Sequence, residues 1–357
     1  MGILEKLASK EMKRRDFVKL CAAVTAAFSL PKTFTKDVAY ATEKALSKPA
    51  VIWLEGQDCT GCSESLLSSL NPSAAEIVLD MLSIRYHETI MAGSGLVSEK
   101  AFQETVAQGN YILVVEGSIP RADDRFCQIG GRNFIDIVKD AAKNAALVIG
   151  VGSCASYGGG IPGATPSKGA GVAEFITDKP VINLPTCPLK PTHLVSTIMY
   201  FLTSNAVPPL DKYKRPLAFY STLLHDNCPR RGQFEKGNYL TDWNDTEQRE
   251  YCLLLKGCKG PKTYTDCAQI WWNEGANFCI NAGAPCAGCA QPEFYGGFTP
   301  LYDKQDTFDI GPNKSLNLDT VGMAMTGAAV AGAAIHGIGR VISGSDHKEE
   351  ETKKEAL

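Results

Sequence analysis

Eleven of the thirteen cysteines fall into three groups whose spacing suits the ligands of metal centres. The first group joins a C-x-x-C loop to two distant cysteines: Cys59, Cys62, Cys154 and Cys187. The second group has a histidine three residues ahead of its first cysteine: His225, Cys228, Cys252 and Cys258. The third group ends in another C-x-x-C loop: Cys267, Cys279, Cys286 and Cys289. The three groups therefore predict three separate sites.

Iron suits these groups best, because iron–sulfur clusters are held mainly by cysteine thiolates, four for each [4Fe–4S] cluster. Structural zinc, a redox dithiol or a disulfide remain alternatives for any single C-x-x-C pair. Zinc favours compact ligand pairs, a dithiol enzyme needs one pair, and a chain of 357 residues needs no disulfide staples. Cys127 fits no group, and we interpret it as a buried free thiol. Three clusters in one chain would form a path for electrons.

Short apolar strands alternate with helical patterns in the part of the chain that carries the first group. This alternation predicts a parallel α/β sheet, which must position the four cysteines. The expected strands are Val51–Leu54, Tyr111–Val115, Ala146–Val151 and Val181–Leu184. Cysteines of the first group follow the first, third and fourth of these strands. Ligands of open α/β sheets gather beyond the carboxyl ends of the strands, so we expect these four cysteines to form one site.

A nucleotide site at the same edge is not expected. Residues 150–155 fit G-x-G-x-x-A, but a lone match is weak, and the next strand ends in Pro185-Thr186 without a ribose-binding acid. The net charge of −3 gives no indication of a nucleic-acid partner. From about residue 206 the alternation of strands and helices stops, and Gly, Pro and Cys become dense. We expect a loop-rich domain there that metal–sulfur bonds hold in order.

The N-terminal segment has the features of a twin-arginine export signal. Arg14 and Arg15 precede a short apolar run, and Ala39-Tyr40-Ala41 offers a cleavage site. This export route moves folded proteins, which suits a chain that must receive its clusters before it crosses the membrane. A chance arginine pair on an amphipathic helix is the alternative. Cys21 lies inside the predicted signal.

The C-terminal segment is apolar over residues 321–342, which as a helix would measure about 33 Å and span a bilayer core of roughly 30 Å. Basic residues follow it, so this end is expected to stay cytoplasmic. A soluble Ala/Gly-rich helix is the alternative. His336 within it suits a bundle-facing polar residue, or a position near a haem or quinone of a partner.

Several motifs together closely resemble the small subunit of [NiFe] hydrogenases over the length of the chain. They begin with C-T-G-C-S-E-S from Cys59 and G-S-C-A from Gly152. They continue with H-D-N-C-P-R from His225, G-C-K-G-P from Gly257 and P-C-A-G-C from Pro285. The resemblance implies a flavodoxin-like parallel-sheet domain followed by a loop-rich iron–sulfur domain and a C-terminal transmembrane helix.

The resemblance also assigns the clusters. The first group would hold a proximal [4Fe–4S] cluster, the second a distal [4Fe–4S] cluster, and the third the medial cluster. Many relatives have proline near position 279 and a [3Fe–4S] medial cluster, whereas Cys279 here supplies a fourth thiolate, as in the [NiFeSe] branch. We therefore expect a medial [4Fe–4S] cluster, with [3Fe–4S] as the alternative.

The implied function is electron transfer from a large subunit, where a nickel–iron centre splits hydrogen, to a membrane cytochrome b or another quinone-linked membrane subunit. The expected location is the periplasmic face of the cytoplasmic membrane. An iron–sulfur carrier of another redox complex and a zinc-stabilised binding protein are the alternative functions. The expected domain organisation follows the chain: signal 1–41, flavodoxin-like domain 48–205, iron–sulfur domain 206–305, linker 306–320, anchor 321–342 and tail 343–357.

Overall fold

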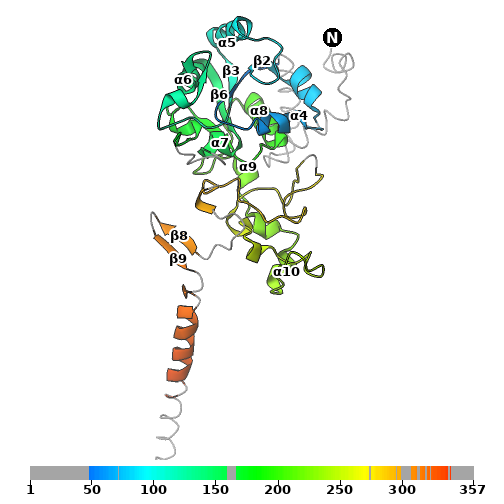
Figure 1. Ribbon diagram of the computed structural model, residues 1–357, viewed down its shortest axis with the longest axis vertical. Coiled ribbons are helices and arrows are strands. Elements are labelled where there is room, and N and C mark those ends of the chain that lie inside the picture. The colour runs from blue at the N-terminus through cyan, green and yellow to red at the C-terminus, as the bar shows by residue number, and fades with distance from the viewer. Residues whose placement is uncertain are drawn as a thin grey trace, which may run out of the picture. The chain divides into compact units, whose positions relative to one another are not determined.

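The structure is a computed structural model (Figure 1). It describes these residues: 48–70, 72–158, 166–272, 275–294, 296–298, 307–311, 314–317, 320–321, 323–336 and 338. The predicted signal and the predicted cytoplasmic tail lie outside them. The chain divides into two compact units, Met1–Asp303 and Lys304–Leu357.

The first unit is built on a five-stranded parallel sheet in the order β2-β1-β3-β6-β7. Its strands are β1 (Ala50–Glu55), β2 (Ser83–His87), β3 (Tyr111–Glu116), β6 (Ala145–Val151) and β7 (Val181–Leu184). Numbered within the sheet alone, this order is 2-1-3-4-5, that of flavodoxin-like folds. The four predicted strands and the parallel sheet are confirmed, and β2 is the one strand of this sheet that was not predicted.

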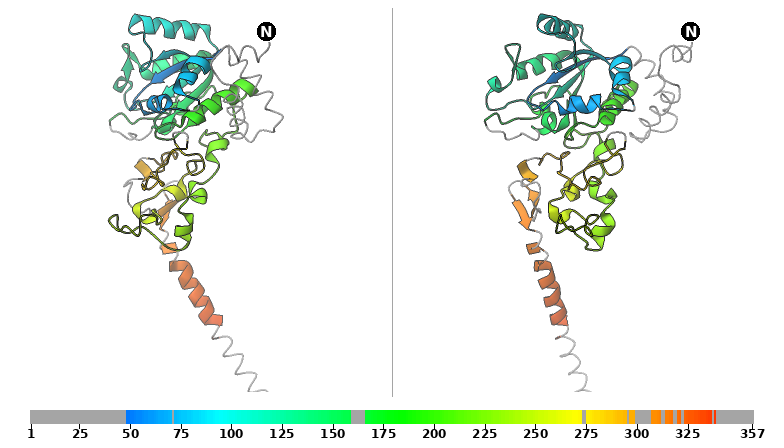
Figure 2. Two further views of the ribbon diagram at one scale, coloured as in Figure 1. Left: turned by 90° about the vertical axis from the view of Figure 1, so that its right-hand side faces the viewer. Right: turned by 45° about the vertical axis from the view of Figure 1, so that its right-hand side comes forward.

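Alternate side chains of the strands enter two separate cores. Val51 and Trp53 pack with α4 (Gly61–Leu67) and α8 (Pro191–Ser204) on one face. Ile52 and Leu54 pack with α5 (Leu96–Gln108) and α6 (Phe134–Asn144) on the other face. Figures 1 and 2 show helices on both sides of the sheet. Each fully buried large apolar side chain contributes about 1.5–3 kcal/mol, so both faces fix the position of the sheet.

The other elements of the sheet domain are short and lie in the connections between strands. They are η2 (Glu76–Met81), η3 (Asp124–Phe126), β4 (Gln128–Ile129), β5 (Arg132–Asn133), α7 (Gly152–Tyr157) and η4 (Val172–Glu174). Strands β4 and β5 form a small antiparallel pair.

After α8, the described residues of the first unit form only short helices among loops, as the sequence predicts. The helices are α9 (Leu217–Tyr220), η5 (Leu224–Asn227), α10 (Arg231–Glu235), η6 (Leu254–Lys256), η7 (Gly260–Lys262) and η8 (Gly296–Phe298). A small core joins five apolar side chains to two cysteines of the third group: Leu224, Leu240, Leu253, Phe278, Ile280, Cys267 and Cys286. Two predicted metal ligands are therefore part of the core that orders this region.

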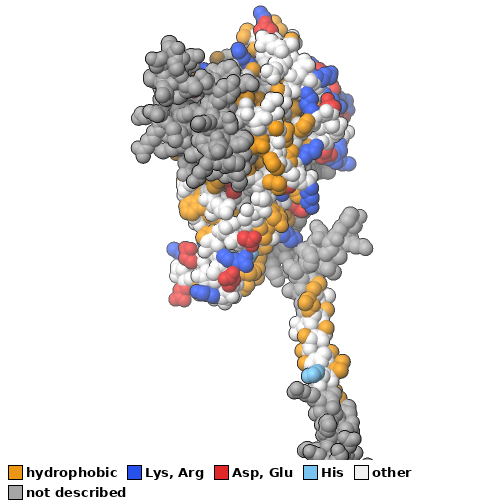
Figure 3. Space-filling view, turned by 180° about the vertical axis from the view of Figure 1, so that it is seen from behind, with side chains coloured by type: hydrophobic (Ala, Val, Ile, Leu, Met, Phe, Trp, Pro, Cys, Tyr) orange, Lys and Arg blue, Asp and Glu red, His pale blue; other side chains and the backbone are white. Residues whose placement is uncertain are grey.

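The second unit contains an antiparallel hairpin of β8 (Thr307–Gly311) and β9 (Lys314–Asn317), which lies within the predicted linker. Residues 320–321, 323–336 and 338 are helical. Figure 3 shows hydrophobic side chains along this helix, with a histidine among them. Among the described residues, no helix has both the length and the hydropathy needed to cross a membrane.

Candidate metal centres

The first group of cysteines lies at the carboxyl edge of the sheet. Cys59 and Cys62 follow β1 at the start of α4, Cys154 lies on α7 after β6, and Cys187 follows β7. Burial raises the pKa of the Cys62 thiol well above its usual value, and Glu116 and the nearby sulfurs of Cys154 and Cys187 raise it further. Burial and the neighbouring Cys59 sulfur likewise raise the pKa of Cys187. The structure therefore brings the four thiols together.

The chain leaves little room around these sulfurs. Gly152 has φ of +77°, and a Cβ atom there would lie 2.5 Å from Sγ of Cys62. A Cβ at Gly61 would lie 3.1 Å from Sγ of Cys59. The N–H of Leu189 donates a hydrogen bond to Sγ of Cys62 over 3.3 Å. A glycine at position 152 is thus required both by the backbone and by the sulfur beside it.

The third group lines a cavity of about 410 Å³. All four cysteines of the third group border this cavity, and so does Cys187 of the first group. Most of the other lining side chains are apolar, among them Leu224, Phe278, Ile280 and Phe294. Cys279 therefore contributes to the same wall as the other three thiols. Burial and the neighbouring sulfurs raise the pKa of Cys286 well above its usual value.

The three cysteines of the second group are gathered around Cys258. Burial raises the pKa of this thiol, and the Cys228 and Cys252 sulfurs add to that rise. His225 lies on η5, three residues before Cys228, with its ring edge-on to Phe234 at a centroid distance of 4.6 Å. Burial and the charge of Arg231 lower the pKa of His225, which favours the neutral imidazole that metals bind. Cys127, outside all groups, is a half-buried free thiol.

Backbone contacts join the groups in the order first, third, second. The N–H of Cys187 donates to the sulfur of Cys289, which links the first group to the third. The N–H of Cys286 donates to Sγ of Cys258 over 3.4 Å, and the N–H of Lys259 donates to the carbonyl of Cys286 over 2.7 Å. The third group thus lies between the other two.

The donor sets fit iron–sulfur clusters. Soft thiolates are the protein ligands of such clusters. Burial and sulfur–sulfur repulsion both favour the neutral thiol, so thiolates at these positions need a cationic partner such as iron, and metal binding would release protons. The cavity lined by the third group provides both the sulfurs and the apolar surroundings. Among the described residues, no three His, Cys, Asp or Glu side chains converge closely enough to hold a single metal ion.

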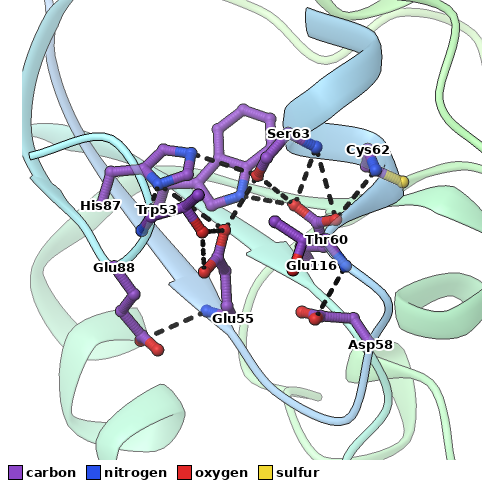
Figure 4. A network of polar contacts seen from close by, with 10 residues as sticks. Trp53, Glu55, Asp58, Thr60, Cys62, Ser63, His87, Glu88 and Glu116 are labelled. Carbon is purple, nitrogen blue, oxygen red and sulfur yellow. Dashed lines mark hydrogen bonds and ion pairs between the residues drawn. The ribbon is translucent and has the colours of Figure 1, made fainter. Parts of the chain in front are cut away.

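Glu116 holds the C-x-x-C loop of the first group, and the sequence analysis missed it. Its carboxylate lies at the end of β3 and is almost fully buried. It accepts hydrogen bonds from the N–H of Cys62 over 2.9 Å and of Ser63 over 3.1 Å, and from Nε1 of Trp53 over 3.0 Å (Figure 4). Helix α4 has no side-chain cap of its own at Thr60, so Glu116 satisfies its first free N–H groups.

Other titratable groups surround Glu116 (Figure 4). Burial lowers the pKa of His87 to about 4, although Glu55 opposes that shift. Burial raises the pKa of Glu88 to about 7, with a further contribution from the charges of Glu55 and Asp58. Nε2 of His87 lies 3.2 Å from Oγ of Ser63, which in turn donates to Glu116. A polar residue directly after the apolar run of β3 was the one sequence signal for this network.

Comparison with known proteins shows the family of this chain. A family model that describes the C-terminal part of the NiFe/NiFeSe hydrogenase small subunit matches residues 220–302. The "Uptake hydrogenase small subunit" of Afipia carboxidovorans is 39% identical over 345 residues, covering 94% of this chain and 93% of that protein. The chain belongs to the NiFe hydrogenase small subunits. It is therefore the electron-transfer subunit of a hydrogenase heterodimer and pairs with a large subunit. Members of this family carry iron–sulfur clusters.

Other known proteins resemble either the sheet domain alone or most of the chain. The family model "NADH ubiquinone oxidoreductase, 20 Kd subunit" matches residues 59–201, so the sheet domain is shared with another class of redox complex. The "Quinone-reactive Ni/Fe-hydrogenase small chain" of Wolinella succinogenes is 36% identical over 346 residues, which is 93% of this chain and 97% of that one. The reduced Ni-Fe-Se hydrogenase from Desulfomicrobium baculatum superposes with a TM-score of 0.68 at 34% identity, over 72% of this chain and all of the other.

We expect Gly152→Ala to abolish iron binding by the first group, because the new Cβ would displace the Cys62 sulfur. Gly131→Ala is the matched control, since Gly131 has the same φ of +77° but no atom within 4 Å of a built Cβ. Both variants should lose about 1–2 kcal/mol to backbone strain. Iron content per heterodimer separates them, and equal iron in the two variants would contradict the prediction.

We expect Glu88→Gln to stabilise the protein at pH 8. The pKa of Glu88 is raised from 4.5 to about 7 in the folded state, so its ionisation destabilises the fold progressively as the pH rises from about 4.5 to about 7. Glutamine keeps an oxygen that can accept from the Glu55 N–H. The gain should be about 1–2 kcal/mol at pH 8 after allowance for solvent screening, and should disappear below about pH 4.5.

Thermal unfolding midpoints at pH 5.5 and pH 8 measure this effect. Glu104→Gln, at an exposed position on α5, is the control and should change neither midpoint. An equal gain from Glu88→Gln at both pH values would show that the charge is not its cause.

Proposed function

We propose that this small subunit holds three iron–sulfur clusters and passes electrons along them from the hydrogenase large subunit. The first group would hold a proximal [4Fe–4S] cluster and the second a distal [4Fe–4S] cluster with His225 as its fourth ligand. The third group, including Cys279, would hold a medial [4Fe–4S] cluster. The observation that carries the proposal is the arrangement of the thiols in series, with Cys187 bordering the third group and Cys286 contacting Cys258.

The protein's own part is to hold and insulate the ligands. When bound, such clusters accept and release single electrons. Glu116 fixes the loop of Cys62, and Gly152 leaves room for its sulfur. Apolar side chains such as Phe278 and Ile280 form part of the wall around the third group. Peptide N–H groups directed at Cys258 and Cys289 stabilise their thiolates and connect neighbouring groups through hydrogen bonds.

We further propose that the enzyme is exported by the twin-arginine route and anchored at the periplasmic face of the membrane by residues 321–342, with the tail at 343–357 in the cytoplasm. The paired arginines, the apolar C-terminal sequence and the basic residues after it support this assignment. The names of the uptake and quinone-reactive relatives agree with it. The electron acceptor would be a membrane cytochrome b or another quinone-linked subunit.

The proposed domains within the mature chain are a flavodoxin-like domain at 48–205 and an iron–sulfur domain at 206–305. The matches of two different family models to residues 59–201 and 220–302 support a boundary between them. Residues 306–320 would connect the second domain to the anchor.

We expect Cys279→Ala to convert the medial cluster to a [3Fe–4S] form. The wild-type heterodimer should contain about twelve irons in the small subunit and show little [3Fe–4S] EPR signal after anaerobic oxidation. The variant should lose one iron and gain a strong [3Fe–4S] signal. Cys127→Ser, which changes a thiol outside the groups, should leave both values unchanged. A strong [3Fe–4S] signal in the intact wild type would refute a four-iron medial cluster.

Co-purification tests the enzyme and its anchor together. A tag on the small subunit should recover a nickel-containing large subunit from membranes, and hydrogen-dependent dye reduction should follow the pair. Deletion of residues 321–357 should release an active heterodimer into the soluble periplasmic fraction, because the cluster ligands all precede residue 290. Retention of the truncated enzyme on the membrane would show that another segment or subunit anchors it.

A further inference from the structure

A buried charged network connects the sheet domain to the loop-rich part of the same unit. Nζ of Lys190 lies 2.7 Å from Oδ1 of Asp266, and Nε2 of His193 lies 2.9 Å from Oδ2 of the same carboxylate. The exposed fraction of the side chain is 2% for Lys190, 5% for Asp266 and 1% for His193. A lysine so fully buried is uncommon and must be paired.

The network lies between two proposed clusters. Lys190 and His193 are at the start of α8, directly after the loop of Cys187. Asp266 is the residue before Cys267, the first ligand of the third group. Lys190 also donates to the carbonyl of Ile270, so it binds the segment on both sides of Cys267. These contacts attach the loop of the third group to the loop of the first.

Tyr220 closes the network on the other side. Its hydroxyl lies 3.2 Å from Nδ1 of His193 and donates to the carbonyl of Pro185 over 2.8 Å. Pro185 is two residues before Cys187. The His193 ring also stacks on Phe219 at a centroid distance of 4.2 Å. The Cys187 loop is therefore held from both ends by one set of buried side chains.

The two charges of the network act on Cys267 in opposite directions. Asp266 directly precedes Cys267 in the chain, and the Lys190 ammonium contacts both the Asp266 carboxylate and the Ile270 carbonyl, so a positive and a negative charge lie beside this ligand. The ammonium therefore stabilises negative charge on this sulfur and the carboxylate destabilises it. A cluster bound there gains negative charge on reduction, so each charge would shift its reduction potential in its own direction.

We propose that Lys190, His193 and Asp266 form a charged clamp that positions the third group against the Cys187 loop and sets the reduction potential of the medial cluster. This inference rests on the proposed three-cluster function. The three residues are positioning residues, since their described contacts are with one another, with protein backbone and with Tyr220 and Phe219. A buried ion pair is a poor source of stability compared with apolar packing, which agrees with a positioning role.

The test uses charge-removing variants in the assembled heterodimer. Lys190→Met should lower the reduction potential of the medial cluster, and Asp266→Asn should raise it, as measured by EPR-monitored redox titration. The double variant Lys190→Met/Asp266→Asn should return close to the wild-type value. Damage to the local structure alone would shift both single variants in the same direction, so opposite shifts identify the effect of charge.

Controls keep the outcome decisive. Lys100→Met removes an exposed lysine from an ion pair with Glu104 and should leave the potential unchanged. If Lys190→Met fails to assemble, Lys190→Gln, which can still donate to Asp266, should show the same fall. Shifts of the same sign, or none, overturn the proposal. Iron content and EPR of the wild type separately test the three clusters, so a failure there is distinguishable from a failure of the clamp.

Discussion

A buried thiolate is stable only beside positive charge or hydrogen-bond donors, and this constraint governs the loop-rich half of the first unit. Its few apolar side chains surround cysteines whose pKa values burial raises, so the ligands do not become thiolates without help. The chain supplies that help through peptide N–H groups directed at Cys258 and Cys289 and through the ammonium of Lys190. Iron would supply the remainder and would cross-link loops that hydrophobic packing alone cannot order.

The sheet domain solves a different problem, because it must bring together cysteines far apart in the sequence. Parallel strands end at one edge, and three loops from that edge carry the four thiols of the first group. Hydrophobic periodicity was enough to predict this, since β1, β3, β6 and β7 are buried on both faces and read as continuous apolar runs. Strand β2 lies at one edge of the sheet, and its alternating sequence with Arg85 exposed does not give that signal.

The contacts that position the ligands could not be predicted from local sequence. Glu116 lies 54 residues from Cys62, and Asp266 lies 76 residues from Lys190. Nothing near Lys190 distinguishes it from a surface lysine until the fold buries it against Asp266. The hairpin β8–β9 lies where the sequence suggested a linker, although the sequence Gly311-Pro312 is itself a turn signal. Cysteine spacing identifies the ligands, whereas long-range packing determines their support.

Cys187 follows the last strand of the sheet and also borders the cavity of the third group, and this position has a consequence for synthesis on the ribosome. The first group is incomplete until β7 has emerged, and the third group is incomplete until Cys289 has followed. A nascent chain thus exposes unpaired cysteines for most of its translation. Protection of those thiols from oxidation must therefore last until nearly the whole first unit has been made.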